Sequence, residues 1–171
     1  MNSGGPHGFG QLIAPPFAWS EGWASFYSVS TFSRWIGEPF AMYWDIQGGQ
    51  SLWIDYDGAT YFGGDLIRPD PYYGMGQDLD ESYVASMLWH LWDGKDVPEG
   101  AGGDDGMALG TGPVLAAVGS ERFTQWNRGV QGADFVDFVD ATICGGANLD
   151  AVNQTVVNVL GFPYDGQPGC P

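Results

Sequence analysis

Apolar and small residues fill one stretch near the start of the chain almost without a break. The segment PPFAWSEGWASFYSVSTFSRWI places aromatic or small side chains around most of a helical wheel. Its two leading prolines suit the first turn of a helix, and Gly37 and Pro39 stop the pattern. We therefore predict a helix from about Phe17 to Ile36 that is buried on both sides.

The pattern then changes to two runs of aromatic and β-branched residues. They lie in PFAMYWDIQGGQSLWIDYDG (39–58), on either side of Gly48 and Gly49. Two glycines supply the positive φ angles that a tight turn needs, so this segment predicts a β-hairpin. Residues 62–77 are rich in Gly and Pro and predict a loop.

Helical periodicity returns further along the chain. Asp78 or Asp80 can cap a helix whose apolar residues recur at positions 84, 87, 88, 91 and 92, and Gly94 ends it. Residues 95–112 form a polar, Gly-rich stretch that predicts a loop. The tail predicts short helices at 113–118, 120–127, 132–143 and 149–160.

These elements predict a mainly α fold with a small β-hairpin, an α+β class. A chain of 171 residues is long enough to bury roughly 70% of its unfolded surface around one core. We find no internal repeat and no clear domain boundary. The prediction is a single domain, or part of one, over residues 1–171.

The charge excludes some partners. The chain has 21 acidic and 5 basic residues, a formal net charge of −16, and the basic residues are scattered along the sequence. Such a surface repels phosphate backbones and anionic lipid headgroups, so we expect neither nucleic acid nor a membrane as partner. No run approaches the 18 apolar residues of a spanning helix.

Two cysteines, Cys144 and Cys170, enclose a loop near the end of the chain. In an oxidising compartment a bond between them would stabilise the fold by about 3 to 4 kcal/mol, and two buried free thiols are the alternative. We predict that they are bonded, which would tie the tail to the helix at 132–143.

Glu21 stands out in the first helix, because its neighbours in AWSEGWASFYS are aromatic, small or hydroxylated. Ala18, Ala24 and Ser25 lie on its side of the helix and would let another element approach closely. A buried carboxylate needs a cation, a metal or several donors. The plain alternative is an acid stabilised by the dipole at a helix start.

Two segments resemble a known family. AWSEGWASFYS is similar to the third-ligand helix of the gluzincin zinc metallopeptidases, the thermolysin-like group, and Glu21 matches the ligand glutamate. The connector SGGPHGFGQLIAPP before it, and the later helix DESYVASMLWHLWDG, also resemble secreted bacterial members. The resemblance covers residues 1–94, and residues 95–171 carry no motif of the family.

The resemblance implies the helical C-terminal part of a zincin-like peptidase domain, with zinc as cofactor and a peptide or protein as substrate. It also implies a secreted, extracellular bacterial protein, which the cysteine pair supports. In these proteins two histidines of an H-E-x-x-H helix and the glutamate hold the zinc, and the first glutamate polarises the metal-bound water.

The chain departs from the family because it has only His7 and His90 and no H-E-x-x-H. We expect it to be inactive by itself, with Met1 as an internal methionine after the missing helix. The alternative is a diverged pseudoenzyme, a non-catalytic extracellular binding or structural module, in which Glu21 is held by Arg34 or by backbone donors.

Other candidate residues follow from the resemblance and from side-chain chemistry. His7, Tyr27 and Tyr83 could donate hydrogen bonds to a substrate or an oxyanion, and each has a plainer role, as an exposed loop histidine or as packing aromatics. Ser20 and Ser25 flank Glu21, and Ser25 stands where many gluzincins have an aspartate that orients a zinc-bound histidine.

His90 and the loop acids complete the candidates. His90 shares a helix face with an acid and is expected at the surface. Calcium is considered for the acids at 55, 57, 65, 104 and 105, but DYDGATYFGGD fails the EF-hand pattern, so solvated loop acids are the prediction.

Overall fold

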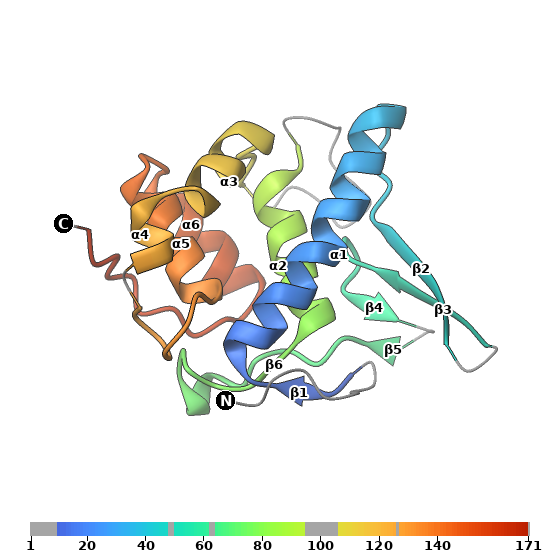
Figure 1. Ribbon diagram of the computed structural model, residues 1–171, viewed down its shortest axis with the longest axis horizontal. Coiled ribbons are helices and arrows are strands. Elements are labelled where there is room, and N and C mark those ends of the chain that lie inside the picture. Colours follow the sequence, from blue (N-terminus) through green and yellow to red (C-terminus); the bar gives the residue numbers. More distant parts are fainter. Residues whose placement is uncertain (1–9, 48–49, 62–63, 95–105, 126, 171) are drawn as a thin grey trace.

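The computed structural model describes residues 10–47, 50–61, 64–94, 106–125 and 127–170. Two helices cross its centre, and they divide a small sheet on one side from a group of short helices on the other (Figure 1). The predicted α+β class is therefore confirmed. None of the helices in these ranges has the length and apolarity to cross a lipid bilayer.

The first central helix, α1 (Pro15–Ile36), begins and ends close to the predicted positions. The two prolines occupy its first turn, and Gly37 ends it with φ of 73° while its N–H donates to the carbonyl of Ser33 at 2.9 Å. A positive φ of this kind is the usual helix stop that glycine permits. The sequence signals at both ends thus act as expected.

The second central helix, α2 (Glu81–Trp92), is capped by Asp80, whose side chain accepts from the Ser82 N–H at 2.9 Å. Its residues from 82 to 92 are all buried. Trp89 and Trp92, with ring centroids 5.1 Å apart, are among the largest fully buried side chains. This helix is the centre of the core.

The predicted hairpin is present as β2 (Met42–Gln47) and β3 (Gln50–Asp55), antiparallel with Met42 opposite Asp55. Its turn, at 48 and 49, lies outside the described residues. Two short strands that the sequence did not predict, β4 (Thr60–Tyr61) and β5 (Gly64–Asp65), extend it to the order β2-β3-β4-β5.

A second small sheet joins distant parts of the chain. β1 (Leu12–Ile13) pairs antiparallel with β6 (Leu79–Asp80), immediately before α1 and α2 respectively. The segment before β6, predicted as loop, contains a turn of 3₁₀ helix at Pro71–Tyr73. The β1–β6 pairing fixes the starts of both central helices side by side.

The remaining helices are close to their predicted positions. They are α3 (Thr111–Val118), α4 (Glu121–Gln125), α5 (Phe135–Cys144) and α6 (Leu149–Asn153), continued by a π-helix at Gln154–Val159. The predicted disulfide is also confirmed. Cys144 and Cys170 are bonded with their Cα atoms 5.5 Å apart, which ties the tail to the end of α5.

Candidate functional site

Glu21 lies on the solvent side of α1, which corrects the expectation that both sides of this helix are buried. Ser20, Ala24 and Ser28 are exposed with it, and the buried side consists of other residues of the helix (Ala18, Trp19, Gly22, Phe26, Val29, Ser30 and Ser33). Within the described ranges Glu21 makes no hydrogen bond or ion pair. Its carboxylate is therefore available to a ligand.

The close approach of a second element occurs at Gly22, not on the Glu21 side of α1. A Cβ on Gly22 would lie 2.6 Å from the backbone oxygen of Glu81 and 2.8 Å from Cβ of Val84. Only glycine fits this crossing of α1 and α2. Because residues 21 and 22 are adjacent, the crossing fixes the direction in which Glu21 leaves the helix.

A buried polar group lies one helical turn beyond Glu21. Ser25 is half-buried there and faces the phenol of Tyr56, which is fully buried. Burial raises the pKa of Tyr56, and the negative charges of Glu81 and Asp80 raise it further. A hydrogen bond with the Ser25 side chain partly offsets this rise. This phenol stays neutral and is a hydrogen-bond donor that the sequence did not reveal.

Tyr56 and Asp80 are held firmly in place. The Tyr56 N–H donates to the carbonyl of Ala41 at 3.0 Å, and its carbonyl accepts from the Ser86 hydroxyl at 2.6 Å. Burial raises the pKa of Asp80, and backbone N–H groups that include Ser82 oppose the rise. The two central helices and the sheet thus meet around one buried polar cluster.

The other candidate residues are spread over the molecule. Tyr83 is fully buried and its hydroxyl donates to the carbonyl of Leu160 at 2.5 Å, so it serves as a core contact. Tyr27 stacks on Trp23, with ring centroids 6.0 Å apart, and helical periodicity puts it on the side of α1 away from Glu21. His7 lies outside the described residues.

His90 corrects another expectation. It is buried together with its neighbours on the same helix face, Tyr83, Ser86 and Asp93. The prediction of a surface histidine was wrong because α2 is covered on all sides, and helical periodicity cannot indicate an exposed face in such a helix.

The described residues contain no group of three or more His, Cys, Asp or Glu side chains that could hold a metal ion. Asp55, one of the acids considered for calcium, instead closes a turn, because one of its oxygens accepts from the N–H groups of Asp57 and Gly58, both at 3.1 Å. Of the other acids, 104 and 105 lie outside the described ranges. Any metal at Glu21 would need ligands from elsewhere.

A second group of charged residues, around Asp140 on α5, was not expected. Asp140 is fully buried and accepts from the guanidinium groups of Arg122 and Arg128 and from the hydroxyl of Tyr164. Arg128 also pairs with Asp165 at 2.8 Å. The basic residues, expected to be scattered, thus include two that meet at one buried acid.

The start of α5 adds two more buried acids to this group. Asp134 and Asp137 form a capping box, in which each side chain accepts from the backbone N–H of the other residue. Burial, and then the charge of Asp134, raise the pKa of Asp137 to about 6. Each acid has donors inside the fold, which marks the group as structural.

Compared with protein-family models, with curated proteins and with solved structures, the chain has no match.

Proposed function

We propose that the chain carries the third zinc ligand, Glu21, of a secreted gluzincin-like metallopeptidase, with the two histidines and the catalytic glutamate supplied by a segment outside these 171 residues. The observation that carries the proposal is the placement of Glu21. It is an exposed carboxylate without a partner among the described residues. Its helix, α1, packs closely against α2 at the neighbouring residue, Gly22.

The surroundings of Glu21 suit a neighbouring helix. Ser20, Ala24 and Ser28 are small and exposed near Glu21, so a second helix could approach this stretch of α1 closely. The large exposed side chains of Phe32 and Trp35 lie further along the same side of the helix. The two segments that resemble the family, in α1 and α2, also pack directly against each other at Gly22. The proposal therefore rests on an available carboxylate, an accessible helix face and a rigid support.

The chemistry assigned to these residues is limited. Zinc, when bound, would polarise a water molecule and the substrate carbonyl. Glu21 would contribute one negative charge and one oxygen ligand. Catalytic zinc takes three protein ligands, so the isolated chain should neither bind zinc at nanomolar affinity nor cleave peptides.

The experiment uses a chain extended upstream in its own reading frame to include an H-E-x-x-H segment. Zinc affinity is measured by calorimetric titration. Peptidase activity is measured on an unstructured protein substrate. Glu21→Gln should lower zinc affinity by at least tenfold and remove most activity, because it removes a ligand charge. Glu38→Gln, a glutamate that is also exposed and lies beyond the end of α1, is the matched control and should change neither.

Three results would overturn the proposal. The first is an upstream frame with no H-E-x-x-H segment, and the second is an extended Glu21→Gln variant with unchanged zinc affinity. A nanomolar zinc site in the isolated 171-residue chain would contradict the ligand count on which it rests.

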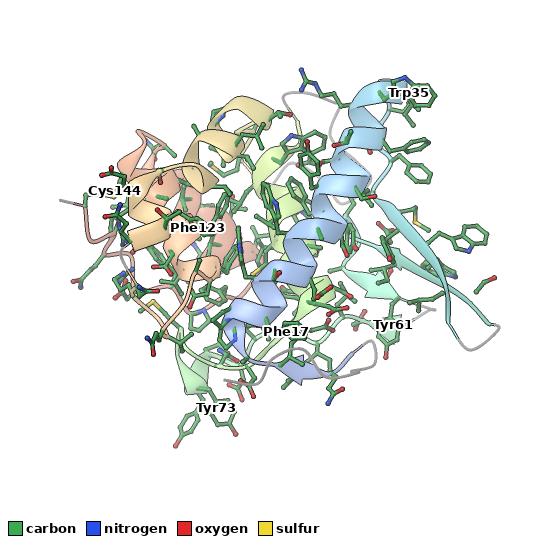
Figure 2. All side chains as sticks on the ribbon, in the orientation of Figure 1. Phe17, Trp35, Tyr61, Tyr73, Phe123 and Cys144 are labelled. Atoms are coloured by element: carbon green, nitrogen blue, oxygen red, sulfur yellow. A yellow bond between two sulfur atoms is a disulfide. The ribbon has the colours of Figure 1, made fainter. Side chains whose placement is uncertain are left out.

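A second candidate is a non-catalytic extracellular binding module, and exposed aromatic residues favour it. Phe32 contacts the rings of Trp35 and Phe40, with centroids 6.0 and 5.1 Å apart, and all three side chains are exposed. Figure 2 shows Trp35 at the far end of α1 from Phe17. The holding of Glu21 by Arg34, which this alternative included, is not seen among the described contacts.

A further inference from the structure

A cavity of about 180 Å³ lies between α1 and α3, on the side of α1 away from Glu21. Its walls are mainly aromatic and aliphatic, with Trp23, Tyr27 and Leu115 beside Phe26 and Trp92. An apolar cavity of about 150 Å³ is known to accept benzene, so this one is large enough for one six-membered ring.

The cavity is already built in the free chain. Trp23 stacks on Tyr27, and Phe26 meets the edge of Trp92 with ring centroids 6.0 Å apart. The indole N–H of Trp92 donates to the hydroxyl of Thr111 at 3.0 Å, which holds that ring in place. Because these contacts hold Trp23, Phe26 and Trp92 in place, a ligand ring would not have to order these three side chains.

Arg34 gives the cavity a preference for anionic ligands. It is an exposed residue that lines the cavity, and no hydrogen bond or ion pair to it occurs among the described residues. Arg34 is thus a cation with no acidic partner in the described part of a chain whose net charge is −16. An anionic group a few bonds from the bound ring would reach Arg34.

We propose that this cavity binds a single aromatic ring that carries a carboxylate, the chemistry shared by small aromatic acids and by peptides that end in phenylalanine. The ring would lie against Trp23, Phe26 and Trp92, and the carboxylate would pair with Arg34. The site does not involve Glu21 or zinc. The failure of either proposal therefore leaves the other one standing.

The test titrates the 171-residue chain with N-acetyl-phenylalanine, its C-terminal amide, and 3-phenylpropionate. Binding is followed by NMR through the indole N–H signals of Trp23 and Trp92. We expect saturable shifts of these two signals with millimolar Kd for the acids, and an affinity about fivefold lower for the amide, which lacks the charge. A tighter Kd for N-acetyl-phenylalanine than for 3-phenylpropionate identifies a peptide end as the preferred ligand, and the opposite order identifies a small acid.

Two variants separate Arg34 from general charge effects. Arg34→Gln should lower the affinity for N-acetyl-phenylalanine about fivefold and leave that for the amide unchanged, so that the acid and the amide bind equally. Arg68→Gln is the matched control, because Arg68 is also exposed but does not line the cavity, and it should change neither affinity. The proposal is overturned if the two indole signals do not shift, if acid and amide bind equally to the unmodified chain, or if both variants have the same effect.

Discussion

Two carboxylates in this protein have opposite surroundings, Glu21 on α1 and Asp140 on α5. Asp140 is fully buried and is held by two arginines and a tyrosine hydroxyl, whereas Glu21 is exposed and has no partner in the described part of the chain. A buried charge is tolerated only when donors surround it, so the partners of Asp140 mark it as part of the fold. Glu21 has no such partners among the described residues, so its carboxylate does not support the fold and is free for a ligand.

The largest expected effect is at Asp140. Asp140→Asn leaves Arg122 and Arg128 without their shared anion in a buried place, so the free energy of unfolding should fall by about 3 to 5 kcal/mol. Urea unfolding followed by circular dichroism measures the loss. Asp165→Asn is the control, because Asp165 is exposed and Arg128 is its one ion-pair partner among the described residues, and it should cost less than about 1 kcal/mol. A loss at Asp140 no larger than at Asp165 would show that the buried group is not structural.

The next effect is at the crossing of α1 and α2. Gly22→Ala places a methyl group against the backbone of Glu81 and against Val84, so we expect a loss of about 1 to 3 kcal/mol through overpacking. Gly112→Ala is the control, because Gly112 lies in a helix with open space around it and should gain about 0.5 to 1 kcal/mol. If both variants were stabilised in urea unfolding, the close contact at Gly22 would not exist.

The two regions also differ in how far the sequence predicts them. Prolines, glycines and capping acids are local signals, and they correctly indicated α1, α2, the hairpin and the tail helices. The resemblance drew attention to Glu21, but the aromatic and small residues on every side of α1 gave no indication of which face is exposed. Helical periodicity fails for such a segment because every face is apolar enough to be buried.

Contacts between distant residues were not predictable in the same way. The pairing of β1 with β6 involves two residues from each strand, too few for a strand pattern to appear. The partners of Asp140 come from α4, the loop after it and the C-terminal tail, and nothing in the spacing of Arg122, Arg128 and Tyr164 indicates that they meet. A single sequence shows which residues can pair but not which ones the fold brings together.

The acids at the start of α5 predict a dependence of stability on pH. Burial, followed by the charge of Asp134, raises the pKa of Asp137 to about 6, so the folded state holds a proton that the unfolded chain has released. This contribution favours folding at low pH and is lost as the pH rises from about 4 to about 6. The urea midpoint should fall across that range, and Asp137→Asn should flatten the fall. An unchanged slope in the variant would exclude Asp137 as its source.

The smallest expected effect is at Glu21 in the isolated chain. Its size distinguishes a carboxylate that binds a ligand from one that stabilises the fold. Glu21→Gln removes a charge that is exposed and without a partner in the described residues, so the free energy of unfolding should change by less than about 0.5 kcal/mol. Any change should be a gain, because the chain already carries a net charge of −16 and self-repulsion decreases when one negative charge is removed. Urea unfolding of Glu21→Gln beside Asp140→Asn, in one buffer at pH 7, measures the difference directly. A loss of more than about 1 kcal/mol at Glu21 would mean that its carboxylate supports the fold, and the contrast between the two acids would then no longer favour a metal ligand at this position.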